Sequence, residues 1–325
     1  MRKNLTTRLL ALSLFVTLLP TTGWSQAGSW PSKPVRLIVP AAAGGPTDIV
    51  GRVVAAELSN VLGQQFWVEN RVGAGHLLGM TAGAQAESDG YTFLVVTTPY
   101  VVMPSLQKKM PYEMKDLQPV IWMTSSPFVL VVPPTLPVKN VQELVALAKA
   151  KPNELNMASA GPTTGPHLTG ELFRLSAGIK VQHVAYRGGP QSETAILRGE
   201  AAFLFDTPSG ALPHVEAGAM RGLAVTSLKR MDNAPNIPTV AESGIPGFEA
   251  DSWNGLVAPA GVPKAIVGRM EAAVAEVLAK PDVKKRLNDA GFTPVAAPAA
   301  AFADLIARDL VKWSRVVKEA GLTAE

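Results

Sequence analysis

The chain has 325 residues, of which 47% are hydrophobic and 17% are charged. The charged fraction lies below the usual one of about 25%, which argues against a disordered chain and favours buried α/β layers. The net charge is only +4, from 30 Lys and Arg against 26 Asp and Glu. Because no Lys- or Arg-rich block occurs either, nucleic acid is not expected as a partner.

The complete absence of cysteine narrows the chemistry further. Disulfides, thiol catalysis and zinc–thiolate sites are excluded, so the fold has to rest on its hydrophobic core. Because single cores stop growing beyond about 250–300 residues, the length predicts about two domains.

The first 27 residues have the pattern of a secretory signal peptide. Arg2, Lys3 and Arg8 form a positively charged start, Leu9–Leu19 form an apolar run, and a small-residue cleavage site ends near Ala27. The run is shorter than the roughly 18 residues that a membrane-spanning helix needs. We therefore expect an exported protein. Cleavage of the signal peptide would remove three basic residues and no acidic ones, which leaves 27 Lys and Arg against 26 Asp and Glu.

The first predicted strand leads into a turn built from small residues. Val35–Val39 have a strand pattern, and Pro46 begins a helix whose apolar residues recur at near-3.6 spacing. Between them, Ala41–Gly45 carry almost no side chain, so a ligand could approach the backbone closely. Unpaired N–H groups and the helix dipole would favour an anion there, with Asp48 in the first helical turn. The same pattern also fits a tight turn that binds nothing.

The next segments continue the alternation of strands and helices. We predict strands over 65–70 and 91–96 and a helix over 77–86. Thr97 and Thr98 follow the second of these strands, at the carboxyl end, where open α/β sheets bind ligands. Their hydroxyl groups could donate to an acid or simply cap a turn.

Two further strand–loop–helix units repeat this arrangement in the middle of the chain. The first joins a strand over 155–159 to a helix over 165–175. The second joins a strand over 181–186 to a helix over 190–197, with Arg187 in the loop. Each joint places small residues or hydroxyl groups where helix N–H groups converge, and three such joints strengthen the prediction of an anion site.

The last part of the chain predicts a return between domains and two packing helices. A buried strand ends in Asp206, whose carboxylate could bind an amine or hydroxyl group of a ligand or cap the residues that follow. A Pro- and Gly-rich stretch over 236–247 is predicted as a linker and residues 255–259 as the return crossing. Long helices are predicted over 263–279 and 299–320.

Recognisable catalytic motifs are absent from the sequence. The four histidines form no H-x-x-x-H pair and have no cysteine beside them, so no metal site is expected. The G-x-S-x-G pentapeptide of α/β hydrolases does not occur. The sequence therefore does not support an enzyme. A secreted hydrolase or lyase that uses Asp48, His167 or Asp206 is the rival hypothesis.

Motifs along the whole chain beyond the signal peptide resemble those of one known family. They are Val39–Pro40 with Ala43–Asp48, Val68–Arg71 with Gly73–Gly75, Ser88–Thr92, His167–Leu168 with Gly170–Phe173, Tyr186–Gly188, Leu212–His214, Leu223–Ser227, Pro238–Glu242 and Ala258–Gly261. In these motifs the chain is similar to the Bug (TctC-like) family, the periplasmic solute-binding receptors of tripartite tricarboxylate transporters.

The resemblance implies an α/β fold of the two-domain type II periplasmic binding protein class, with a ligand cleft between the domains and a two-strand hinge. The implied domains are residues 28–126 with 251–325, and residues 127–250. The family binds dicarboxylates, tricarboxylates, acidic amino acids and aromatic acids and delivers them to membrane permease subunits. We therefore expect a periplasmic monomer without a cofactor, a metal or catalytic residues. A receptor that serves a membrane signalling partner is an alternative.

The resemblance also extends the candidate site into the second domain. Backbone N–H groups and ordered waters at the opening loop would hold one carboxylate, and the loop over 159–164, Arg187–Gly188 and Asp206 would contribute from the other side. The complete set of predicted ligand-binding residues is Ala41, Ala42, Ala43, Gly44, Gly45, Asp48, Thr98, Ser159, Thr163, Thr164, His167, Arg187, Gly188 and Asp206.

Three positions depart from the pattern of this family. Ala41 replaces the usual Phe or Tyr, which should widen the cleft or remove a stacking surface. Arg187 replaces a Lys and could pair bidentately with a carboxylate or face solvent. Met103 stands where Asn is frequent. These departures bear on which ligand is bound more than on the fold.

Overall fold

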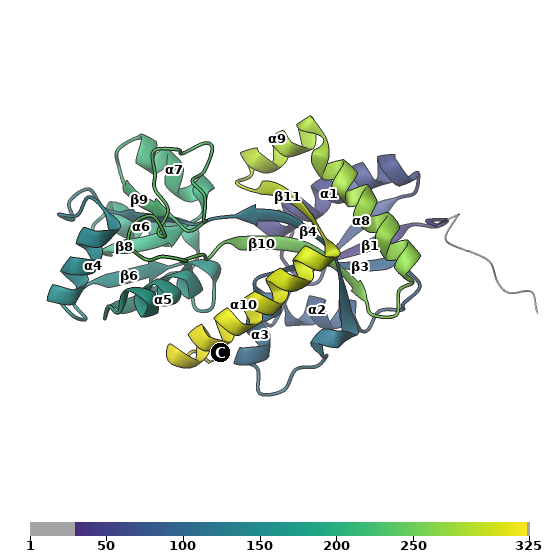
Figure 1. Ribbon diagram of the computed structural model, residues 1–325, viewed down its shortest axis with the longest axis horizontal. Coiled ribbons are helices and arrows are strands. Elements are labelled where there is room, and N and C mark those ends of the chain that lie inside the picture. The colour runs from purple at the N-terminus through teal and green to yellow at the C-terminus, as the bar shows by residue number, and fades with distance from the viewer. Residues whose placement is uncertain (1–29, 324–325) are drawn as a thin grey trace, which may run out of the picture. The chain divides into compact units, whose positions relative to one another are not determined.

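The computed structural model describes residues 30–323, whose framework is two β-sheets with helices packed around them (Figure 1). The strands of the first sheet are β1 (Val35–Val39), β2 (Phe66–Asn70), β3 (Thr92–Thr97), β4 (Leu117–Ser126), β10 (Ser252–Pro259) and β11 (Thr293–Pro298). Their order is β11-β4-β10-β3-β1-β2. β1 pairs in parallel with β2 and β3, and β10 runs antiparallel to β3 and β4.

The second sheet repeats the topology of the first. Its strands are β5 (Val129–Val132), β6 (Asn156–Ser159), β7 (Gln182–Ala185), β8 (Phe203–Asp206) and β9 (Arg221–Val225), in the order β7-β6-β8-β5-β9. β6 is parallel to β7 and β8, and β5 is antiparallel to β8 and β9. In each sheet three parallel strands therefore stand in the order second, first, third, with an antiparallel strand beside the third.

Ten α-helices surround these sheets in the described part of the chain. They are α1 (Pro46–Leu62), α2 (Leu77–Ala84), α3 (Pro99–Leu106), α4 (Val141–Ala150), α5 (Gly165–Ala177), α6 (Gly189–Leu197), α7 (Pro208–Glu216), α8 (Lys264–Ala279), α9 (Pro281–Asp289) and α10 (Ala299–Glu319). None of them is long and apolar enough to cross a membrane. The α/β fold class predicted from the sequence is confirmed. The predicted signal peptide lies outside the described residues.

The chain passes between the two sheets twice, once from β4 to β5 and once from β9 to β10. Figure 1 shows β4 and β10 side by side as they run toward the second sheet, and Ser126 of β4 is paired with Ser252 of β10. The half-buried Asp251 joins both passages, because its carboxylate accepts hydrogen bonds from Ser125 Oγ at 2.9 Å and Thr226 Oγ1 at 3.1 Å. The domain boundaries given above stay a prediction.

The core is rich in aromatic side chains. Phe173, Phe203, Phe205 and Phe248 form an edge-to-face and stacked cluster with ring centroids 5.4–6.5 Å apart. Such aromatic pairs contribute about 0.5–1.5 kcal/mol each beyond their buried area. In β10, Gly255 is required by packing. A Cβ atom there would lie 2.0 Å from the ring of Phe302, so α10 can press this ring against the strand.

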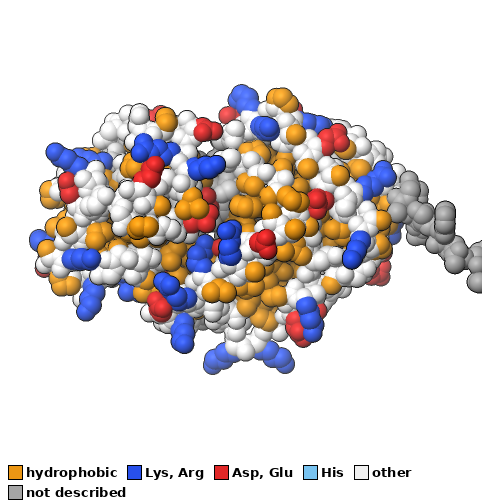
Figure 2. All heavy atoms as spheres, viewed as in Figure 1, with side chains coloured by type: hydrophobic (Ala, Val, Ile, Leu, Met, Phe, Trp, Pro, Cys, Tyr) orange, Lys and Arg blue, Asp and Glu red, His pale blue; other side chains and the backbone are white. Residues whose placement is uncertain are grey.

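Charged side chains of both signs are interspersed over the face drawn in Figure 2, in agreement with the balanced composition. Several elements were not predicted from the sequence, among them α3, β4, α7, α9 and β11. Prolines account for several of these omissions, because Pro104 lies inside α3 and Pro213 inside α7, where proline normally breaks a helix. Two of these unanticipated elements, α3 and α7, begin at the candidate site.

Candidate functional site

A pocket of about 510 Å³ lies where loops of both sheets meet. It is lined by Ala41, Pro46, Thr47, Gly75, His76, Thr97, Thr98, Pro99, Val102, Met103, Leu106, Ser126, Phe128, Pro162, Thr163, Thr164, Gly165, Pro166, Thr207, Pro208, Ser209, Ser252, Ala290, Gly291 and Phe292. None of these lining residues is an Asp, Glu, Lys or Arg. Its size falls in the range of about 300–1,000 Å³ typical of small-molecule sites.

Four helices begin at this pocket. Pro46 and Thr47 open α1, Thr98 precedes α3, Gly165 opens α5, and Pro208 opens α7. The first N–H groups of a helix have no carbonyl partner within the helix, and its dipole places partial positive charge at that end. Four such ends around one uncharged pocket create an environment for an anion.

Thr98 adds a polar group that has no hydrogen-bond partner among residues 30–323. Its residue is 6% exposed and lines the pocket, and its hydroxyl oxygen is buried without a hydrogen bond. The side chain does not cap α3 either, although Thr98 is the N-cap residue. A buried hydroxyl normally has a partner, so Thr98 stays a predicted hydrogen-bond partner of a ligand oxygen.

The opening loop is held by Asp48 from inside. Asp48 is 1% exposed and accepts hydrogen bonds from the Gly44 N–H at 2.8 Å, Arg52 Nε at 2.7 Å and Asn70 Nδ2 at 2.7 Å. The same Asn70 amide donates to the carbonyl oxygen of Ala41 at 2.9 Å. Although burial alone would raise the pKa of Asp48, the three hydrogen bonds and the charge of Arg52 hold it below its usual value. Asp48 therefore fixes the shape of the loop.

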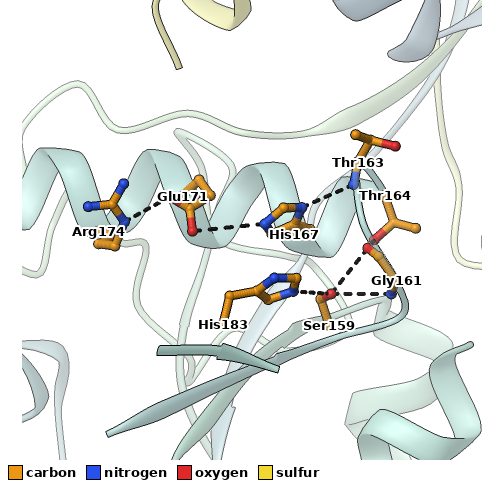
Figure 3. A network of polar contacts seen from close by, with 8 residues as sticks. All are labelled: Ser159, Gly161, Thr163, Thr164, His167, Glu171, Arg174 and His183. Atoms are coloured by element: carbon orange, nitrogen blue, oxygen red, sulfur yellow. Dashed lines mark hydrogen bonds and ion pairs between the residues drawn. The ribbon is translucent and has the colours of Figure 1, made fainter. Parts of the chain in front are cut away.

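On the opposite side of the pocket, a network of polar contacts supports the loop before α5 (Figure 3). The N–H of Thr163 donates to His167 Nδ1 at 3.0 Å, and Ser159 Oγ shares a hydrogen bond of 2.7 Å with His183 Nε2. The two imidazole rings are stacked, with centroids 3.8 Å apart. Because Nδ1 accepts the Thr163 N–H, the ring proton of a neutral His167 is on Nε2, which faces Glu171 Oε1 at 3.9 Å.

The stacked histidines are expected to make the free energy of unfolding depend on pH. Burial lowers the pKa of His167 to about 4, and burial with the neighbouring His167 lowers the pKa of His183 to about 4, from 6.5 in both cases. Between these values the unfolded chain binds more protons than the folded one, so the histidines favour folding above pH 6.5 and lose this effect as the pH falls toward 4. His183→Asn should therefore reduce the loss of unfolding free energy between pH 7 and pH 5 by about 1–2 kcal/mol.

Urea unfolding at several pH values checks this prediction, and Asp251→Asn provides a control of opposite sign. Burial raises the pKa of Asp251 from 3.8 to about 6, so this carboxyl group loses stabilisation as the pH rises through that range. Removing it should make the stability of the variant rise more steeply with pH than that of the wild type. Equal pH profiles for His183→Asn and the wild type would show that the histidine pair does not titrate as described.

Asp206 and Arg187 lie outside the pocket lining. Asp206 is 3% exposed, and its Oδ1 accepts the N–H of the adjacent Thr207 at 2.8 Å, while the side chain that caps α7 is that of Thr207, which accepts the Gly210 N–H. Burial together with the charge of the neighbouring Glu193 raises the pKa of Asp206 to about 7. The Arg187 side chain is exposed, and its backbone N–H donates to Gln191 Oε1.

Four of the predicted ligand-binding residues line the pocket: Ala41, Thr98, Thr163 and Thr164. The other predicted residues do not line the pocket, and their role in ligand binding stays a prediction. They are Ala42, Ala43, Gly44, Gly45, Asp48, Ser159, His167, Arg187, Gly188 and Asp206. Sequence reasoning missed the apolar lining, above all Val102, Leu106, Phe128 and Phe292. For α3 a signal existed, since its pocket residues recur at helical spacing.

The chain matches the sequence model of the Tripartite tricarboxylate transporter family receptor over residues 50–322. It belongs to this family. Protein BugT of Bordetella pertussis is 33% identical over 321 residues, which cover 98% of each chain. A further relative of the family, a UPF0065 protein from the tcbD-tcbE intergenic region of a Pseudomonas strain, is 33% identical over 314 residues, which cover 95% of this chain and 94% of the relative.

Solved structures of family members have the same fold. Rpa4515 of R. palustris, determined with adipate, is 32% identical with a TM-score of 0.75, and the match covers 90% of this chain and 99% of that one. MatC from Rhodopseudomonas palustris, with bound malate, is 30% identical with a TM-score of 0.72, covering 89% and 100%. The periplasmic binding protein BugD is 30% identical with a TM-score of 0.73, covering 91% and 100%. The family relationship and the two-domain periplasmic binding protein fold predicted from the sequence are thus confirmed.

Proposed function

We propose that the protein is a periplasmic receptor that captures a small organic carboxylate and delivers it to the membrane subunits of a tripartite tricarboxylate transporter. Family membership supports the receptor role and the transporter class. The structures of two relatives with the dicarboxylates adipate and malate support the ligand class. The predicted signal peptide supports export to the periplasm. The protein would act as a monomer that closes on its ligand by hinge motion.

The observation that carries the ligand class is the set of four helix starts around a pocket without charged side chains. A carboxylate can accept hydrogen bonds from several backbone N–H groups there, directly or through water, so no Lys or Arg is needed to bind it. The unpaired Thr98 hydroxyl group adds a further donor at the same place. A cationic ligand would meet the positive ends of four helix dipoles and find no carboxylate in the lining.

The arrangement of the buried polar residues argues against the rival enzyme hypothesis. Asp48, His167 and Asp206 are each at most 4% exposed, and none of them lines the pocket. Ser159 and His183 do form a serine–histidine pair, yet Ser159 is 0% exposed and is also absent from the lining. A general base has to come within about 3 Å of the proton that it abstracts. These side chains do not line the pocket, so they are not placed to act on a ligand bound there.

A thermal-shift screen tests the proposal with malate, adipate, citrate and benzoate as probes. A ligand at about 100 times its dissociation constant stabilises the folded protein by about 2.7 kcal/mol, which raises the melting temperature by a few degrees. Shifts with sugars or cations and none with any carboxylate would overturn the ligand class. Conversion of a bound acid during prolonged incubation, followed by mass spectrometry, would overturn the receptor role.

A further inference from the structure

One wall of the pocket is an uninterrupted apolar face of α3. Pro99, Val102, Met103 and Leu106 all line the pocket and follow one another at intervals of three, one and three residues. Residues spaced i, i+3, i+4 and i+7 lie on the same face of a helix. At a rise of 1.5 Å per residue this wall is about 10 Å long from Pro99 to Leu106.

The other hydrophobic lining comes from segments far away in the sequence. Phe128 follows β4 and is 5% exposed, while Phe292 follows α9 and is 7% exposed. The connection between these two segments is direct, because Ser126 Oγ donates to the carbonyl oxygen of Gly291 at 2.7 Å. Two aromatic side chains and an apolar helix face therefore belong to the same pocket.

The α3 face is poorly matched to a short acid that carries several polar groups, because Pro99, Val102, Met103 and Leu106 offer it no hydrogen-bonding side chain. A hydroxyl group or second carboxylate placed against the α3 face would lose its water without gaining a hydrogen bond, at a cost of about 1–3 kcal/mol for a neutral group and more for a charge. An apolar body, in contrast, gains about 25 cal/mol for each Å² removed from water.

Resting on the proposed carboxylate-receptor function, we infer that the ligand is a carboxylate with an extended apolar or aromatic body, of the arylalkanoate class. Its carboxylate lies at the helix starts near Thr98, and its body lies along Val102, Met103 and Leu106. The hydrophobic face of α3 is the specificity element. Short hydroxylated di- and tricarboxylates are the acids that it disfavours.

Isothermal titration calorimetry with 3-phenylpropanoate and malate tests the inference on the full mature protein. The wild type should bind 3-phenylpropanoate at least tenfold more tightly than malate. Leu106→Gln, at a half-buried position of the α3 face, should weaken 3-phenylpropanoate about tenfold and leave malate within threefold. Ser105→Gln is the matched control, because Ser105 is the adjacent α3 residue, also half-buried, and does not line this pocket.

The outcomes separate this inference from the proposed function. Tighter binding of malate than of 3-phenylpropanoate by the wild type would overturn the ligand class inferred here and leave the carboxylate receptor in place. Equal effects of Leu106→Gln and Ser105→Gln would likewise remove α3 as the specificity element. Failure of every carboxylate to bind the wild type would overturn the proposed function itself.

Discussion

Replacing Asp48 with alanine is expected to lower the free energy of unfolding by about 2–4 kcal/mol, the range for removing one partner of a buried charged network. The carboxylate is 1% exposed and accepts three hydrogen bonds, from Gly44, Arg52 and Asn70. The substitution leaves the Asn70 amide short of one acceptor and releases the Gly44 N–H. Urea denaturation followed by circular dichroism measures the loss.

Arg52→Ala is the control for this prediction. The Arg52 side chain is 53% exposed, so its ion pair with Asp48 is screened by solvent, and its removal should cost less than about 1 kcal/mol. Because Asp48 also shapes the loop that carries Ala41, Asp48→Ala should weaken ligand binding in calorimetry as well. A stability loss no larger than that of Arg52→Ala would show that the carboxylate does not hold the loop.

The sequence was most informative where the pattern was local. The joint between β1 and α1 was predicted with its correct helix start. Both signals used for it, Pro46 and the apolar periodicity that follows, depend only on residues adjacent in the sequence. Asn140 is a similarly local signal, because its Oδ1 accepts the N–H of Glu143 at 2.8 Å and caps the start of α4. In contrast, α3 contains Pro104 and β4 contains Pro119, and tertiary packing overrides the local preference of these prolines.

The site itself was predicted only in part, because its residues gain their roles from distant partners. From the sequence, Asp48 is a carboxylate beside a small-residue turn, and nothing local shows whether it faces a ligand or the loop. Its contact with Asn70, 22 residues later, decides for the loop. The segment that carries Phe292 is held at the pocket by the hydrogen bond between Ser126 and Gly291, which are 165 residues apart. No periodicity in either segment predicts this contact.

The topology explains why loop residues dominate the pocket although the sheets form most of the core. In both sheets the parallel strands end at the loops that precede α1, α3, α5 and α7. Ligands of open α/β sheets bind beyond the carboxyl ends of such strands. Since the three parallel strands stand in the same order in both sheets, each sheet contributes two helix starts to the pocket. The repeated topology thus supplies the helix starts of the site, and α3 supplies its apolar lining together with Phe128 and Phe292.

Thr98→Asp is expected to weaken carboxylate binding at least 100-fold. The new carboxylate would stand at the start of α3, in a pocket whose lining holds no Lys or Arg. At an effective dielectric constant of about 20, two like charges about 4 Å apart repel by about 4 kcal/mol. Asp is also a favourable N-cap residue, so the substitution should occupy the free N–H groups of α3 and leave the stability of the ligand-free protein nearly unchanged.

Thr98→Val separates the charge from the hydroxyl group in this experiment. Valine keeps the shape of threonine, and the Thr98 side chain makes no capping hydrogen bond that could be lost. Only the unpaired hydroxyl group disappears, so affinity should fall about tenfold, the value of one hydrogen bond to a charged group. Calorimetry with a carboxylate probe and urea unfolding of both ligand-free variants provide the readouts. If Thr98→Asp binds the carboxylate as tightly as Thr98→Val does, the anion is not held at these helix starts, because a negative charge placed among them would repel it and lower the affinity.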